Sequence, residues 1–179
     1  RAYGIPNPRG ILFVGHRGCG KSLSAKAIAR KLRRPLLRWD IGKTFTGLVG
    51  ESERNARKVF AVADATAPNA FWIDECDKGF AGLASSDKTE GGVTKKIFGS
   101  YLTWREESKS NVFVIATAND IGSLPAEFLS RFDVTFFVDL PNELERRDIF
   151  EIHIRLVGRD PNKFNLEALA RESVGFSGR

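Results

Sequence analysis

The sequence contains no methionine, only two cysteines and no long hydrophobic run among its 179 residues. The two thiols, Cys19 and Cys76, are too few for a disulfide framework, and they have no metal-ligand spacing. A membrane-spanning helix needs about 18 or more apolar residues in a row, and the N-terminus has no charged-then-apolar signal pattern. We therefore expect no membrane segment and a reducing compartment, which by default is the cytoplasm.

The chain begins with Arg1 and contains no methionine, so we expect either a piece of a longer protein or a sequence in which some residues are absent. Its length suffices for one globular domain with part of a second. Apolar residues make up 42% and charged residues 28% of the chain. These fractions are typical of a folded domain, so disorder is not indicated.

The net charge of +6 and the pI near 9.5 raise the question of nucleic-acid binding. The densest basic run, "ARKLRR" at residues 29–34, falls where a helix is expected to end. Cations there complement the helix dipole, so a solvated helix end is the simpler interpretation. Nucleic acid is therefore not the partner that the charge favours.

Short apolar runs alternate with helical patterns, which is typical of an α/β fold with a parallel sheet covered by helices. The runs predict strands, buried on both faces, at 11–14, 35–39, 70–74, 111–118 and 134–138. Apolar residues three and four apart predict core-facing helix stripes made of Leu23, Ala27, Ile28 and Leu32, of Ala56, Val59, Phe60 and Ala63, and of Val93, Ile97, Tyr101 and Leu102. After Pro141, helices at 142–157 and 166–172 form a small appendage.

The segment 15–22, "GHRGCGKS", matches the pattern G-x-x-x-x-G-K-[ST] between a predicted strand and a predicted helix. Its glycines let backbone N–H groups curl around a phosphate, and the helix N-terminus adds partial positive charge. Lys21 would reach the β- and γ-phosphates, and the Ser22 hydroxyl would ligate magnesium. The loop residues expected to bind nucleotide are His16, Arg17, Gly18, Cys19, Gly20, Lys21, Ser22 and Leu23.

Polar residues end two further predicted strands. Asp74 and Glu75 follow "FWI", so the first carboxylate can hold the magnesium shell while the second polarises a water. Asn119 ends "VFVIATAN", and parallel strands bring their carboxyl ends to one edge of a sheet. A neutral amide there can orient the attacking water, although an asparagine at a strand end is also a common turn former. The pattern predicts Mg²⁺-dependent hydrolysis of a bound nucleotide.

A longer set of phrases follows one order along the chain: "GLVGESERNARKVFAVADATAP", "FWIDECDK", "IATAND", "LPAEFLSRFD" and "GFSG". In this order and spacing the sequence resembles the AAA+ ATPases of the AAA subfamily, and most closely the AAA proteins of cyanobacterial and plastid genomes. The resemblance implies a P-loop NTPase core at 1–139, a three-layer αβα sandwich whose five-stranded parallel sheet has the order 5-1-4-3-2. It also implies that 140–179 begins a C-terminal helical lid, and it places the protein in the cytoplasm or the plastid stroma.

The same resemblance assigns roles to single residues. Asp74 and Glu75 would form Walker B, and Asn119 would be sensor 1. Arg131 would be the arginine finger, which acts on the nucleotide of the neighbouring subunit, so the implied partners are further copies in a ring, most often a hexamer, and a protein client. The residues that would pack the adenine are Gly4, Ile5, Ile149 and His153.

Several residues leave alternatives open. Arg131 is either the finger or a surface arginine in an intrachain ion pair, and His153 is either an adenine contact or a half-buried helical histidine. Arg179 is either sensor 2 or a helix-start arginine. Cys19 is either a reactive thiol whose oxidation blocks ATP or a small loop residue. The function expected first is an oligomeric AAA+ ATPase that couples ATP hydrolysis to remodelling of a protein partner. Leu48, where threading members often have an aromatic ring, and the short "LSRFD" favour the alternative, an ATP-dependent regulatory scaffold with slow hydrolysis and no threading. A nucleic-acid-handling AAA+ protein is the third possibility.

Overall fold

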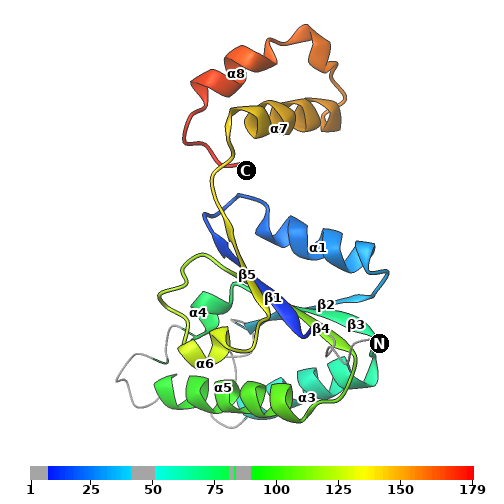
Figure 1. The fold of residues 1–179 in the computed structure, drawn as a ribbon, viewed down its shortest axis with the longest axis vertical. Helices are drawn as coiled ribbons and strands as arrows, with labels where there is room; N and C mark the ends of the chain where they lie inside the picture. The colour runs from blue at the N-terminus through cyan, green and yellow to red at the C-terminus, as the bar shows by residue number, and fades with distance from the viewer. Residues whose placement is uncertain (1–7, 42–50, 81–82, 84–89) are drawn as a thin grey trace. The chain divides into compact units, whose positions relative to one another are not determined.

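The computed structural model describes residues 8–41, 51–80, 83 and 90–179 (Figure 1). Gly4, Ile5 and Leu48, for which the sequence predicts roles, lie outside these residues. The chain divides into two compact units, of which the first contains the residues up to Val14 together with Lys21–Phe137. The second contains Gly15–Gly20 and Val138–Arg179.

A five-stranded parallel sheet forms the centre of the fold, in the order β2-β3-β4-β1-β5. This order, read in the opposite direction, is the predicted 5-1-4-3-2, so the α/β class and the P-loop NTPase topology are confirmed. Each strand lies within one residue of its predicted bounds at both ends. The strands are β1 (Gly10–Gly15), β2 (Leu36–Asp40), β3 (Asn69–Asp74), β4 (Val112–Ala118) and β5 (Val134–Val138).

The predicted burial on both faces is confirmed for the inner strands and wrong for the edge strands β2 and β5. In β2 only Trp39 is buried. All residues of β3 are buried, and β1 and β4 each have a single half-buried position. In β5, by contrast, Val134, Phe136 and Phe137 are 45%, 49% and 67% exposed. An edge strand has a neighbour on one side only, and hydrophobicity along a short run does not reveal how much of that strand is covered.

Helices cover the sheet of the first unit on both faces. In Figure 1, α1 (Lys21–Lys31) lies on one side of the strands, and α3 (Glu51–Ala65) and α5 (Glu90–Glu107) lie on the other. Two short helices, α4 (Cys76–Phe80) and α6 (Ala126–Leu129), follow β3 and β4. No helix among the described residues is both long and apolar enough to cross a membrane.

The buried face of α1 differs from the prediction, whereas that of α3 agrees with it. Ala56, Phe60 and Ala63 of α3 are buried, as expected. In α1 the buried residues are Lys21, Ala25 and Ala29, while the predicted stripe members Leu23 and Leu32 are 70% and 44% exposed. The buried Lys21 side chain hydrogen-bonds Asn119 on β4. Positions four residues apart share a helix face, so this anchor turns the alanines of α1 toward the sheet.

Aromatic rings join α3 and α5 to the sheet. Phe60 of α3 stacks on Trp104 of α5 with ring centroids 4.9 Å apart and an interplanar angle of 9°. The edge-to-face partner of Phe60 is Trp39 of β2, at 5.2 Å, and Phe71 of β3 lies within 6.0 Å of Trp39. Such pairs stabilise a core beyond the area they bury. Phe60 therefore lies where two helices and two strands meet.

The second unit is built around α7 (Glu143–Leu156) and α8 (Leu166–Glu172), with a 3-10 turn at Pro161–Lys163 between them. The start of α7 is fixed by a capping box, in which the Asn142 side chain accepts from the backbone of Glu145 and the Glu145 side chain accepts from that of Asn142. The buried guanidinium of Arg146 donates to the carbonyl oxygens of Ala170 and Pro141, at 2.9 and 2.8 Å. This side chain ties the two helices together.

Truncating Phe60 should destabilise the fold strongly. We expect Phe60→Ala to lower the free energy of unfolding by about 3–5 kcal/mol, because it removes a fully enclosed ring and leaves a cavity. Val62→Ala is the control, since Val62 lies on the same helix and is 52% exposed; it should change the value by no more than about 0.5 kcal/mol. Urea denaturation followed by circular dichroism measures both, and equal losses in the two variants would contradict the assignment.

Candidate active site

The loop after β1 has the backbone conformation that a phosphate cradle needs. Gly15, Gly18 and Gly20 all have positive φ, at 148°, 82° and 94°. A Cβ at Gly15 would come within 1.9 Å of the Val138 carbonyl oxygen, so no other residue fits there. A Cβ at Gly20 would meet nothing within 4 Å, which leaves open space beside the loop backbone. The loop therefore fits a phosphate group.

Lys21 and Asn119 are brought together, as the sequence predicts. The Lys21 Nζ atom donates to Asn119 Oδ1 at 3.1 Å. The other end of the amide is also held, because Asn119 donates from its backbone N–H and from Nδ2 to Asp77 Oδ2, at 3.2 and 3.3 Å. Asp77 is buried, and among the described residues its Oδ1 has no hydrogen-bond partner.

Asp77 is a site residue that the sequence reasoning missed. It lies on the first turn of α4, three residues after Asp74, and it fixes which atom of the Asn119 amide faces Lys21. The sequence does contain a signal for Asp77, which is a second acid three residues after Asp74. An acid at that distance from the strand end stays close to the edge of the sheet when the chain turns into a helix. An ionised carboxylate only accepts hydrogen bonds, and so it orients the amide nitrogen toward itself.

Thr117 joins the strand-end residues of β3 and β4. β3 and β4 pair in parallel, with Ile73 opposite Ala116, so the next residues, Asp74 and Thr117, lie side by side. The buried hydroxyl of Thr117 donates to Asp74 Oδ1 at 2.9 Å, and it accepts from Trp72 Nε1 at 3.2 Å and from the Glu75 backbone N–H at 3.3 Å. A hydroxyl has one donor and two acceptor sites, so the three bonds saturate it. This network fixes the Asp74 carboxylate.

The second oxygen of Asp74 is paired with an arginine. Arg38 of β2 donates to Asp74 Oδ2 from Nε at 3.1 Å and from Nη2 at 2.6 Å. The guanidinium also lies over the Trp72 ring, 5.1 Å from its centroid. No role was expected for Arg38, because the expected strand order places β2 beside β3 but does not give the register that brings Arg38 to Asp74.

Glu75 lies just beyond the end of β3 with a left-handed backbone, at a φ of 48°. Its carboxylate accepts from Lys78 Nζ at 2.5 Å, and the two side chains are 49% and 52% exposed.

Cys76, the next residue, is fully enclosed. Burial raises the pKa of its thiol far above the usual value, and the charge of Asp77 raises the pKa further. Cys76 therefore stays protonated and unreactive, whereas Cys19 of the loop is only half-buried.

The predicted magnesium ligands supply suitable chemistry. Ser22 is exposed at the start of α1 and offers a hydroxyl, and Asp74 offers a carboxylate. Oxygen ligands are what Mg²⁺ prefers, and Mg²⁺ commonly binds one or two protein groups together with substrate phosphates. Within the described part of the chain, no three His, Cys, Asp or Glu side chains form a metal cage. The donor set therefore fits a metal that arrives with a nucleotide.

Leu23 was also predicted to contact the nucleotide, and its side chain is 70% exposed.

The second unit contains a cavity of about 230 Å³ that is lined in part by Ile149, His153, Phe176 and Gly178. Two of these, Ile149 and His153, are the lid residues predicted to pack the adenine.

The loop residues Gly15–Gly20 belong to the same unit. A Cβ at Gly18 would lie 2.5 Å from Ser177 Oγ and 3.0 Å from Arg179 Cβ. His16 Nε2 lies 3.8 Å from Asp139 Oδ1, and Arg17 is exposed.

Arg131 has an intrachain partner in this structure. Its Nη2 donates to Glu106 Oε1 near the end of α5, while its Nε is buried without a hydrogen-bond partner among the described residues. The pair matches the alternative that the sequence leaves open for this arginine. A role in trans concerns a second copy of the chain, and it stays a prediction.

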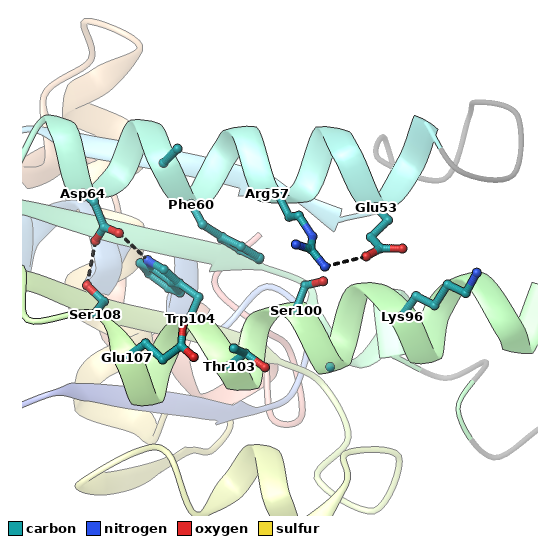
Figure 2. A pocket seen from close by; sticks show the side chains of 12 residues that line it. Glu53, Arg57, Phe60, Asp64, Lys96, Ser100, Thr103, Trp104, Glu107 and Ser108 are labelled. Atoms are coloured by element: carbon teal, nitrogen blue, oxygen red, sulfur yellow. Dashed lines mark hydrogen bonds and ion pairs between the residues drawn. The ribbon is translucent and has the colours of Figure 1, made fainter.

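A larger cavity, of about 620 Å³, lies between α3 and α5 and contains none of the predicted site residues (Figure 2). At one end Asp64 accepts from Trp104 Nε1 at 2.9 Å and from Ser108 Oγ at 2.7 Å. Toward the other end Arg57 donates to Glu53 at 2.8 Å. These bonds join the polar sides of two packed helices, and no cofactor chemistry is indicated.

The sheet order, the glycine loop that leads into Lys21 and the acids at the end of β3 together define a P-loop NTPase. A family model described as "ATPase family associated with various cellular activities (AAA)" matches residues 11–140. The chain belongs to this AAA family of ATPases, which confirms the resemblance noted in the sequence.

Among known proteins, the chain is similar to several that carry the name "Uncharacterized AAA domain-containing protein ycf46". It is 49% identical to the one from Pyropia yezoensis over an alignment of 179 residues. The alignment covers 98% of this chain and 36% of the relative. It is 45% identical to the one from Guillardia theta, over 98% of this chain and 35% of the relative. The chain thus spans about a third of the length of these relatives.

Removing the Thr117 hydroxyl should destabilise the site. We expect Thr117→Val to lower the free energy of unfolding by about 1–3 kcal/mol, because the Trp72 Nε1 and Glu75 N–H donors lose their acceptor inside the protein. The control is Thr103→Val, since Thr103 is exposed on α5; it should stay within about 0.5 kcal/mol of the parent. Chemical denaturation measures both, and an unchanged Thr117→Val protein would contradict the network.

Proposed function

We propose that this protein binds ATP with Mg²⁺ and hydrolyses it as one subunit of a homo-oligomeric ring, and that it couples hydrolysis to remodelling of a protein partner. The observation that carries the proposal is the hydrogen bond from Lys21 Nζ to Asn119 Oδ1. It joins the loop lysine, which would bind phosphate, to the strand-end amide that would orient the attacking water. Membership of the AAA family supports nucleotide binding and hydrolysis in general.

Each residue has a stated part in this proposal. The backbone of the loop and Lys21 bind the β- and γ-phosphates, and Ser22 and Asp74 hold magnesium, which neutralises charge on the phosphates when it is bound. Glu75 takes a proton from the water whose oxygen attacks the γ-phosphorus, and the bond from that phosphorus to the β–γ bridging oxygen breaks. Asn119 orients the water. Glu75 must leave Lys78 to do this, and its half-exposed side chain is free of packing that would prevent the movement.

The adenine would pack against Ile149 and His153 of the second unit, together with Gly4 and Ile5. Support comes from the cavity that Ile149 and His153 line. Arg131 would act on the nucleotide of the next subunit, and it must then exchange Glu106 for the γ-phosphate. A ring, expected to be a hexamer, is therefore part of the reaction.

A regulatory scaffold that binds ATP, assembles and hydrolyses slowly is the second candidate. The observation that favours it is that Asp74, Glu75 and Arg131 are each ion-paired within the single chain. Such pairs hold the hydrolytic groups away from a substrate until something displaces them. The client, and the location in the cytoplasm or the plastid stroma, stay predictions.

Two substitutions separate binding from hydrolysis. Lys21→Ala should abolish binding of a fluorescent ATP analogue, because it removes the cation that holds the phosphates. Glu75→Gln should bind the analogue normally and lower the turnover number by roughly 10²-fold or more, because it removes the base. Lys26→Ala is the control, since Lys26 is exposed on the same helix as Lys21. Normal turnover in Glu75→Gln would rule out the proposed base.

Mixing two inactive variants tests the action of Arg131 in trans. Arg131→Ala alone should lose roughly 10³-fold or more in turnover, and Lys21→Ala alone should bind no nucleotide. In mixed rings the intact Arg131 of a Lys21→Ala subunit faces the intact nucleotide site of an Arg131→Ala subunit, so activity should return in part. Phosphate release measured against the mixing ratio shows this, with size-exclusion chromatography to confirm mixed assembly. Mixed rings without recovered activity would contradict action in trans.

A further inference from the structure

We propose that Arg38 competes with magnesium for the Asp74 carboxylate, so that nucleotide-bound metal must displace the guanidinium before the site is complete. The inference rests on the proposed function, because it concerns the metal that would arrive with ATP. Its starting point is that Arg38 donates two hydrogen bonds to Oδ2 of the carboxylate that the metal would need.

The strand register places Arg38 close to Asp74. Arg38 of β2 pairs with Trp72 of β3, and Asp74 lies two residues further along β3. Side chains two residues apart on a strand share a face, so Arg38, Trp72 and Asp74 all lie on one face of the sheet. Asp40, the register partner of Asp74, follows Arg38 by two residues and lies on that face too. Arg38 therefore lies beside two acids at the carboxyl edge of the sheet.

The two oxygens of Asp74 are both in use. Oδ1 accepts the Thr117 hydroxyl at 2.9 Å, and Oδ2 accepts two N–H groups of Arg38. Bonds from a guanidinium to a carboxylate are charge-assisted and stronger than neutral ones. A metal-bound water that bonds Oδ2 would take the place of Arg38, which is the exposed partner of Asp74, whereas Thr117 is buried.

Arg38 can move, whereas Asp74 cannot. The Arg38 side chain is 55% exposed and that of Asp74 is 10% exposed. Exposed ion pairs are weak, because water and salt compete with them. The Trp72 ring under the guanidinium offers Arg38 a second contact that does not involve the acid. Displacement therefore costs little, and the pair keeps a nearly buried carboxylate neutralised when no metal is bound.

A metal titration tests the competition without relying on turnover. The probe is Mn²⁺, followed by electron paramagnetic resonance, in full-chain protein saturated with a non-hydrolysable ATP analogue and corrected for metal bound by the analogue alone. Arg38→Gln should lower the half-saturating Mn²⁺ concentration by roughly 3- to 10-fold, because a positive charge leaves the carboxylate. Arg57→Gln is the matched control, since it removes an equal charge from an exposed pair on α3; it should leave the value unchanged.

Arg38→Lys supplies a second variant in case Arg38→Gln folds poorly. An ammonium keeps the charge but lacks the two-pronged geometry of the guanidinium, so a smaller fall in the half-saturating Mn²⁺ concentration is expected. An unchanged or raised value in both Arg38 variants, with the parent binding metal and nucleotide, would overturn the competition and leave the proposed function standing. A parent protein that shows no metal-dependent nucleotide binding would overturn both.

Discussion

The site depends on one physical constraint, which is that the carboxylate of Asp74 is nearly enclosed at the end of β3 and must have partners for both oxygens. A buried charge without partners costs several kcal/mol, so neighbouring strands must supply them. β4 supplies the hydroxyl of Thr117, and β2 supplies the guanidinium of Arg38. The same hydroxyl holds the Glu75 backbone. The position of Glu75, the expected base, thus depends on the hydrogen bonds that stabilise Asp74, the residue before it.

A second set of contacts links the start of α1 to the strand ends of the first unit. Lys21 is buried at the first turn of α1, and its bond to Asn119 fixes the rotation of that helix on the sheet. Asp77 fixes the amide from the other side. A residue expected to bind phosphate therefore also has a structural role, which explains why alanines, and not leucines, face the sheet.

The charged groups of the site are paired with one another in the single chain. Asp74 is bonded to Arg38, Glu75 to Lys78, and Arg131 to Glu106. Each pair is partly exposed and therefore weak enough to exchange for a stronger partner. In the proposed mechanism, hydrolysis needs all three exchanges, two at the chain's own nucleotide and one at that of a neighbouring subunit. The pairing therefore supports the proposal that activity depends on assembly.

The strands to within a residue, the phosphate loop and the acids at the end of β3 could be predicted from the residues, because a glycine loop between a strand and a helix is a pattern of consecutive residues. The sheet order followed from the family resemblance. The sequence did not reveal that Arg38 and Thr117 share Asp74, that Asp77 holds Asn119, or that the side chains of β5 are exposed. These features depend on the register of the paired strands and on what covers each face of the sheet. Contacts between residues 36 to 43 positions apart leave no periodic signal in the chain.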